Sequence, residues 1–243
     1  ASASTRPDGT IAISGSGSAT PAGITRQVDI ALVQRLLAGA QGTTRYSGSL
    51  SVRGERHDLR VDSDLTGWRI DAPAPLAKSA AEPMPLRVEL TGLGSERDSI
   101  AVTAGGALAV RLERTRGADH VARIERGVVA VGEPPVLPAR GLVALINLPR
   151  LDVDAWLPLL EGPEAPAPAR AAATAAPAGP AVLPDYVALR ARELVFSGKP
   201  IANVVLGATR LSDGGDTLWA ANISADQING ALTWRPGAGS GSG

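Results

Sequence analysis

The residues best suited to acid–base chemistry are the two histidines, each of which stands next to an aspartate. His57 precedes Asp58, and His120 follows Asp119. A histidine oriented by a carboxylate can act as a general base. However, neighbouring residues of a strand point to opposite faces, and His120 falls in a predicted turn. We therefore interpret both histidines as surface or turn residues.

Other motifs of enzyme and metal sites are incomplete in this sequence. It has no G-x-S-x-G elbow for a serine nucleophile and no cysteine for thiol catalysis or a zinc site. Asp213 and Asp216 flank two glycines without the ligand series of a calcium loop, which favours a hairpin turn. Gly15–Ser18 lacks the third glycine of a phosphate-binding loop and its helix-opening Lys or acidic partner. We interpret it as a flexible turn. We expect no catalytic residue, no metal and no cofactor, and hence a protein that is not an enzyme.

The composition is that of a turn-rich β protein. The chain has 243 residues, of which 44% are hydrophobic, and it contains 28 glycines and 19 prolines. That hydrophobic fraction is too high for a disordered chain. The 24 basic and 24 acidic residues balance to a net charge of zero, and aromatic residues make up only 3%. Nucleic acid is therefore not an expected partner, because binding it needs a basic surface.

Period-two alternation dominates the sequence. Leu86, Val88 and Leu90, for example, alternate with Arg87 and Glu89. Similar alternation recurs in residues 57–71, 100–102, 108–112, 122–125, 142–148 and 187–191, and further strands are predicted at 194–196, 201–210, 218–223 and 231–234. The period of two places one set of side chains on each face of a sheet. The sequence therefore predicts a mainly β protein, an antiparallel meander with one apolar and one polar face.

Only one or two short helices interrupt this pattern. Asp29 is the predicted N-cap of a helix near 30–38, and Gly39 its stop. Asp152 is the predicted cap of a second short helix, whose regularity Pro158 limits.

The chain divides by composition. Residues 1–161 read as a β-sheet segment, 162–184 as an Ala/Pro-rich linker or insert, 185–236 as a continuation of the sheet and 237–243 as a flexible Gly/Ser tail. Because it starts without methionine, we interpret the chain as a piece of a longer protein.

The apolar face of such a sheet must be covered, and periodicity does not say how. Two short helices are too small to cover it. A second sheet would make a sandwich, closure would make a barrel, and a curved sheet could hold an apolar ligand. The small number of aromatic residues leaves an incompletely filled groove open beside a dry sandwich.

Several phrases of the sequence resemble one known family in their content and order. They are Ser63–Gly67 with Asp71–Lys78, Pro85–Val88, Leu151–Leu160, Leu189–Leu194, Asn203–Ala208, Ala221–Gly230 and Trp234–Pro236. On these residues the chain resembles the YhdP family of AsmA-like and TamB-like, bridge-type lipid-transport proteins. The place of Asp62 and Asp64 around the first phrase suggests a solvated face or a turn contact.

The resemblance implies an elongated, curved antiparallel β-meander of the repeating β-groove type, with a U-shaped apolar groove. It also implies a periplasmic region of an inner-membrane-anchored protein in a Gram-negative bacterium. Such a protein would carry phospholipid acyl chains in its groove towards the outer membrane and support outer-membrane biogenesis and the permeability barrier of the cell envelope. The membrane would be reached through parts of the protein outside this chain, and its envelope protein partners are unknown. The alternative is a non-catalytic β-sandwich that acts as a structural scaffold of the envelope.

The groove candidates are the aliphatic residues of one parity within the predicted strands. They are Leu59, Val61, Leu86, Val88, Leu90, Ile100, Val102, Leu108, Val110, Leu112, Leu189, Val204 and Leu206.

Overall fold

A sheet built from long strands dominates the computed structural model, which describes residues 2–28, 30–94, 96–117, 121–161, 183–213 and 216–235. The strands of this main sheet are β1 (Ser2–Thr5), β2 (Ile11–Ala19), β4 (Thr44–Arg53), β5 (Arg56–Ser63), β7 (Leu86–Leu93), β8 (Arg97–Ala104), β9 (Leu108–Arg116), β10 (Ala122–Val131), β11 (Gly141–Asp152), β12 (Tyr186–Phe196), β13 (Lys199–Asp213), β14 (Asp216–Ser224) and β15 (Asn229–Trp234). Two short strands, β3 (Ala40–Gly42) and β6 (Trp68–Ile70), pair separately.

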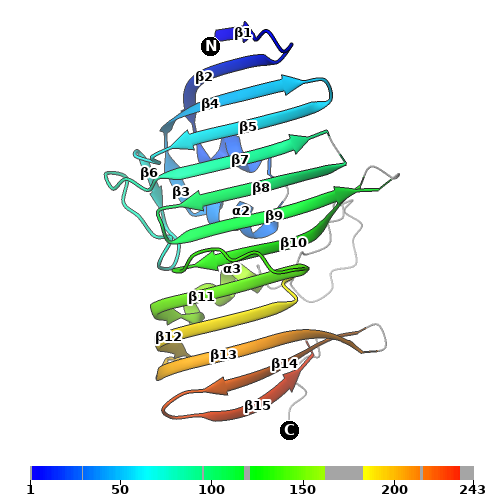
Figure 1. Cartoon of the computed structure of the whole chain (residues 1–243). Helices are drawn as coiled ribbons and strands as arrows, with labels where there is room; N and C mark the ends of the chain where they lie inside the picture. The colour runs from blue at the N-terminus through cyan, green and yellow to red at the C-terminus, as the bar shows by residue number, and fades with distance from the viewer. Residues whose placement is uncertain are drawn as a thin grey trace, which may run out of the picture.

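The main sheet has 13 strands in nearly sequential order, from β1 at one edge to β15 at the other. Because β1 and β15 do not pair with each other, the sheet is open, and it forms an elongated stack of strands (Figure 1). The predicted mainly β, elongated meander is thereby confirmed. The barrel is wrong, and the described residues do not form the two large packed sheets of a sandwich.

The sheet departs from a pure antiparallel meander at its middle. β11 runs parallel to both of its neighbours, β10 and β12. A parallel pair requires the chain to return to the starting edge through a crossover. Residues 132–140 make the first return, and the segment that begins with helix α3 makes the second. The predicted antiparallel pairing therefore does not hold for β11, because alternation looks the same in parallel and antiparallel strands.

In the part of the chain that the structure describes, three short helices lie between strands. They are α1 (Pro21–Thr25), α2 (Ala31–Ala38) and α3 (Val153–Glu161). The Asp152 carboxylate accepts a hydrogen bond from the Ala155 amide at 3.0 Å, which confirms the predicted cap of α3. Asp29, the predicted cap of α2, lies outside the described residues. The N-cap position is occupied by Ile30, whose side chain makes no capping hydrogen bond.

Glycine is required at Gly94 and Gly132, where turns pass close to other parts of the backbone. Gly94 and Gly132 both have positive φ, of 90° and 73°. A Cβ atom at Gly94 would lie 2.0 Å from the Glu55 carbonyl oxygen, and one at Gly132 would lie 2.1 Å from that of Asn147. Only glycine combines this backbone conformation with so close an approach.

The helices lie on one side of the sheet (Figure 1), and two clusters of buried side chains pack beneath them. Val128 and Ala130 of β10 are buried on the other side. Leu37 of α2 and Trp68 of β6 pack with Leu86 and Leu108 of the main sheet. Trp156 of α3 packs against a second cluster that contains Leu189. The helices and the β3–β6 pair therefore cover part of one face, which the strand register identifies below as the apolar face.

Candidate functional site

The strand register places all of the predicted groove residues on one face of the sheet. Residues in register share a face, so each chain of partners forms a row across the strands. The valine row crosses from β5 to β15 and consists of Val61, Val88, Val102, Val110, Val129, Ala144, Val187, Ala208, Ala221 and Leu232. With strands about 4.8 Å apart, this row is about 45 Å long and contains no charged residue.

Two further rows flank the valine row. The leucine row consists of Leu50, Leu59, Leu90, Ile100 and Leu112. The helix-side row consists of Leu86, Ala104, Leu108, Val131, Ile146, Leu189, Leu206 and Ile223. Val204 lies one step beyond this row, in register with Ala191. We call the leucine and valine rows together the apolar strip.

Burial separates these residues into two groups. Leu189 and Val204 are only 8% and 1% exposed, and both belong to the cluster beneath α3. They contribute to the core. The candidates in the apolar strip, such as Val88 and Val110, are half-buried. The strip therefore keeps apolar surface accessible from β5 to β12, whereas Ala208 of β13 and Ala221 of β14 are only 3% exposed and are buried in a cluster with Trp219.

The opposite face of β5 and β7 is polar and solvated. Asp62 accepts from Arg60 Nε and from Arg87 Nε, both at 2.7 Å, and Arg60 also lies 3.6 Å from Glu89. The hydrogen bond from Arg60, with that from Arg87, lowers the pKa of Asp62. Asp64 instead accepts from the Thr66 amide at 2.9 Å in a turn. The two aspartates are therefore engaged separately, and pairs as exposed as these contribute little stability.

Two shallow hollows lie on the sheet outside the apolar strip. One, of about 690 Å³, is lined by residues that include Ser47, Asp62, Arg87 and Thr103, which are partners in one polar row. The other, of about 440 Å³, is lined by residues that include Asn147 and Arg190. Neither hollow is lined by the apolar strip.

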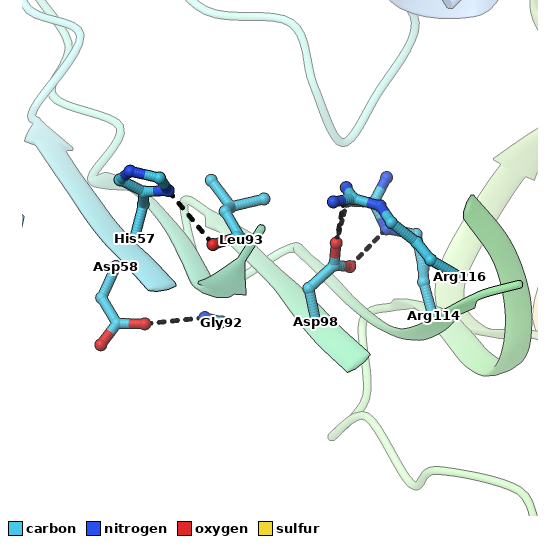
Figure 2. Close-up of polar contacts among 7 residues, drawn as sticks. All are labelled: His57, Asp58, Gly92, Leu93, Asp98, Arg114 and Arg116. Carbon is cyan, nitrogen blue, oxygen red and sulfur yellow. Dashed lines mark hydrogen bonds and ion pairs between the residues drawn. The ribbon is translucent and has the colours of Figure 1, made fainter. Parts of the chain in front are cut away.

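His57 and Asp58 lie on opposite faces of β5, as the alternation predicts (Figure 2). His57 Nδ1 lies 3.3 Å from the Leu93 carbonyl oxygen, whereas the Asp58 carboxylate accepts from the Gly92 amide at 2.7 Å. The aspartate therefore cannot orient the histidine for base catalysis. His120 and Asp119 lie outside the described residues.

The glycine- and serine-rich segment Gly15–Ser18 is not a turn, and this prediction was wrong. It lies inside β2 and pairs with β4, with Gly17 opposite Tyr46. A Cβ atom at Gly17 would lie 3.0 Å from Tyr46 Oη. Gly17 therefore leaves room for the Tyr46 ring. The glycine and serine content of the segment had suggested a flexible turn, but the segment is part of a strand.

Asp213 and Asp216 lie at the hairpin end of β13 and β14, as predicted. The two residues are partners where β13 and β14 meet. Within the described ranges, no group of three or more His, Cys, Asp or Glu side chains is placed to hold a metal ion.

A buried ion cluster borders the apolar strip at the edge away from the helices. Asp98 has a side chain only 1% exposed, and it accepts from Arg114 Nε at 2.6 Å and from Arg116 Nη2 at 3.0 Å (Figure 2). Asp98 stands two residues before Ile100, and Arg114 stands two residues after Leu112. All three charged side chains thus have the parity of the apolar face, a signal that sequence reasoning missed.

The opposite edge of the strip is bordered by a wall of α2, the β3–β6 pair and α3. Lys78 anchors this wall, because its Nζ donates to the carbonyl oxygens of Trp68, Leu65 and Ser79 at 2.5, 2.9 and 2.9 Å. Burial lowers the pKa of Lys78. Arg35 of α2 donates to the Leu159 carbonyl at the end of α3 at 2.6 Å.

A second contact joins helix α3 to the loop that contains Ala74. Trp156 Nε1 of α3 donates to the Ala74 carbonyl at 3.1 Å, across 82 positions of the chain. The wall therefore joins segments from both halves of the chain over one face of the sheet.

The model of the YhdP protein family matches residues 1–242. The chain belongs to the YhdP family. Comparison with curated proteins and with solved structures found no significant match. No helix among the described residues is long and apolar enough to cross a membrane.

The phrases that carried the resemblance to the YhdP family have structural roles in this chain. The phrase Asp71–Lys78 contains the buried cation of the wall. In the phrase Leu151–Leu160, Asp152 caps α3, and Asp154 accepts from the amides of Ser197 and Gly198, both at 2.8 Å. Family membership suggests a bridge-like, AsmA-like lipid-transport protein of the Gram-negative envelope.

Proposed function

We propose that this chain carries phospholipids along its apolar strip, without catalysing a reaction, as a periplasmic part of an inner-membrane-anchored protein. The lipids move towards the outer membrane and support the permeability barrier. The observation that carries the proposal is the valine row, an uncharged row of aliphatic and alanine side chains across ten consecutive strands of the sheet.

The chemistry of the strip suits acyl chains. Each methylene group removed from water contributes about 0.8 kcal/mol. One acyl chain spans about half of a hydrocarbon core of ~30 Å, so the valine row is long enough for several chains in sequence. Its residues are Val, Ala and Leu throughout, so that neighbouring positions offer similar stabilisation. A chain can therefore shift along the row without losing most of its contacts.

The two borders of the strip support the same proposal. The wall of α2 and α3 closes one edge, and the Asp98–Arg114–Arg116 cluster places charge at the other. A phospholipid has the same division, with apolar chains and a charged head group. Nothing in this arrangement requires a nucleophile, base or metal.

Crosslinking from opposite faces of one strand tests the proposal. A photoreactive amino acid at Val110 faces the apolar strip, and one at Ala109 faces the other side of β9. In Gram-negative cells that express the membrane-anchored protein, we expect phospholipid adducts at Val110 and none at Ala109. Equal labelling at both positions, or none at Val110, would sink the proposal.

A further inference from the structure

The ion cluster at the edge of the apolar strip has more positive than negative charge. Asp98 has both carboxylate oxygens occupied, Oδ1 by Arg114 Nε and Oδ2 by Arg114 Nη2 and Arg116 Nη2. Among the residues that the structure describes, Asp98 is the only carboxylate within ion-pair distance of Arg114 or Arg116. Within the described residues, two guanidinium groups therefore share one carboxylate, which leaves one positive charge in excess.

The two arginines are held in place and only partly exposed. Their side chains are 22% and 27% exposed, against 1% for Asp98. A carboxylate needs only one bidentate guanidinium, which Arg114 already supplies. The second cation adds a partly desolvated charge, which is costly unless an anion shares the site. Arg116 donates to Asp98 through Nη2, and a guanidinium has five N–H donors, so donors remain for a second acceptor once the contacts with described residues are counted.

The position of this charge matches the shape of an amphiphile. Arg114 follows Leu112 by two residues on the same face of β9, and Leu112 is in register with Ile100. Figure 2 shows both guanidinium groups beside Asp98, on the side of the sheet to which His57 also points. An acyl chain on the apolar strip would thus begin next to the arginines.

We propose that Arg114 and Arg116 bind the phosphodiester of a glycerophospholipid whose acyl chains lie on the apolar strip. This inference rests on the proposed function and adds a head-group contact to it. Arginine suits this role, because its planar fork matches two phosphate oxygens and keeps its charge at all physiological pH values. Asp98 is a positioning residue that orients both guanidinium groups.

Native mass spectrometry of the full chain in detergent tests the assignment. The probes are phosphatidylglycerol and diacylglycerol with identical acyl chains, offered at equal concentration. We expect wild-type protein to retain phosphatidylglycerol preferentially, and Arg116→Gln to reduce that preference about tenfold. The matched control is Arg111→Gln, which removes the same charge from the other face of β9 and should leave the preference unchanged. Because Arg114→Gln alone would leave Asp98 poorly paired, Arg114 is tested in the double variant Asp98→Asn/Arg114→Gln, which should also lose the preference.

The possible outcomes separate the inference from the proposed function. If Arg116→Gln and the double variant both retain lipids with the wild-type preference, the head-group assignment is wrong while lipid carriage stands. If wild-type protein binds neither lipid, both fail. Inorganic phosphate at millimolar concentration is a third probe. Displacement of phosphatidylglycerol down to the diacylglycerol level by phosphate alone would indicate a free-anion site and overturn the lipid assignment.

Discussion

Arg35 Nη1 donates a hydrogen bond of 2.6 Å to the carbonyl oxygen of Leu159, although 124 positions separate the two residues in the chain. The same nitrogen lies 2.8 Å from the Leu160 carbonyl oxygen. A cation at the end of a helix satisfies carbonyl groups that lack partners within the helix and interacts favourably with the helix dipole. This contact therefore ties α2 to α3 across the apolar face.

Loss of this contact should weaken the wall without unfolding the sheet. We expect Arg35→Ala to lower the free energy of unfolding by about 1–2 kcal/mol, since it removes charge-assisted hydrogen bonds. Chemical denaturation of the purified chain measures the change. Arg53→Ala serves as the control, because the Arg53 side chain is 70% exposed and lies 3.9 Å from its partner Asp8. Equal effects of both substitutions would contradict a specific role for Arg35.

A charge in the valine row should disrupt lipid binding more than folding. Val102 is half-buried in the row, and its neighbour Thr103 faces the polar side of β8. We expect Val102→Asp to reduce phospholipid co-purification at least about tenfold, because loss of only two methylene contacts costs about 1.6 kcal/mol. Thr103→Asp should leave the lipid content unchanged. Undiminished lipid in the Val102→Asp protein would argue against the valine row as the path.

The close approach of Gly132 to β11 predicts a large effect of a single methyl group. We expect Gly132→Ala to destabilise the fold by about 2–4 kcal/mol, because it combines a strained positive φ with a clash against the Asn147 carbonyl oxygen. Gly54→Ala is the matched control. Gly54 also has positive φ, of 58°, but has nothing within 4 Å of a Cβ atom. Its cost should be about 1 kcal/mol from backbone strain alone, as thermal unfolding of the two variants can show.

Asp185 predicts a dependence of stability on pH. A hydrogen bond from Arg210, together with one from the Leu142 amide, lowers the pKa of Asp185 from its ordinary value of 3.8. Because the pKa is lower in the folded chain, the stabilisation is present above about pH 3.8 and is lost as the pH falls through the lowered value. Asp185→Asn should therefore flatten the fall in unfolding free energy between pH 5 and pH 2.

Urea unfolding at several pH values provides this measurement. The control is Asp71→Asn, which removes a carboxylate that is 54% exposed and paired with the nearby Arg69. A steep acid loss retained in the Asp185→Asn protein would show that other groups carry it.

The apolar face was predictable from the sequence because the period of two within a strand and the pairing register between strands both determine which side chains share a face. Once Val88 and Val102 are assigned to one parity, pairing between β7 and β8 brings them together. The parallel strand β11 was not predictable in this way. Alternation looks the same in parallel and antiparallel strands, and only the length and path of residues 132–140 distinguish a crossover from a turn.

The borders of the strip were missed for a different reason. Asp98 and Arg114 occupy positions that alternate in step with the apolar residues of their strands. A charged residue at such a position predicts the end of the strand unless its ion-pair partner is known. Lys78 donates to the carbonyl groups of Leu65 and Ser79, which lie outside regular strands, and of Trp68 at the start of β6, and such an arrangement has no periodic signal. Contacts such as Arg35 with Leu159 depend on where two helices end in space, which no local pattern encodes.

The parallel pairing of β11 with β12 has a consequence for the order of folding. In each hairpin, pairing can begin next to the turn, as between Phe196 and Lys199, and then extend outward. Between β11 and β12, even the first partners, Val143 and Tyr186, are distant in the chain, so that loop closure must come before any contact forms. We therefore expect the strands up to β11 and those from β12 onward to fold as two cooperative units that join last at this seam.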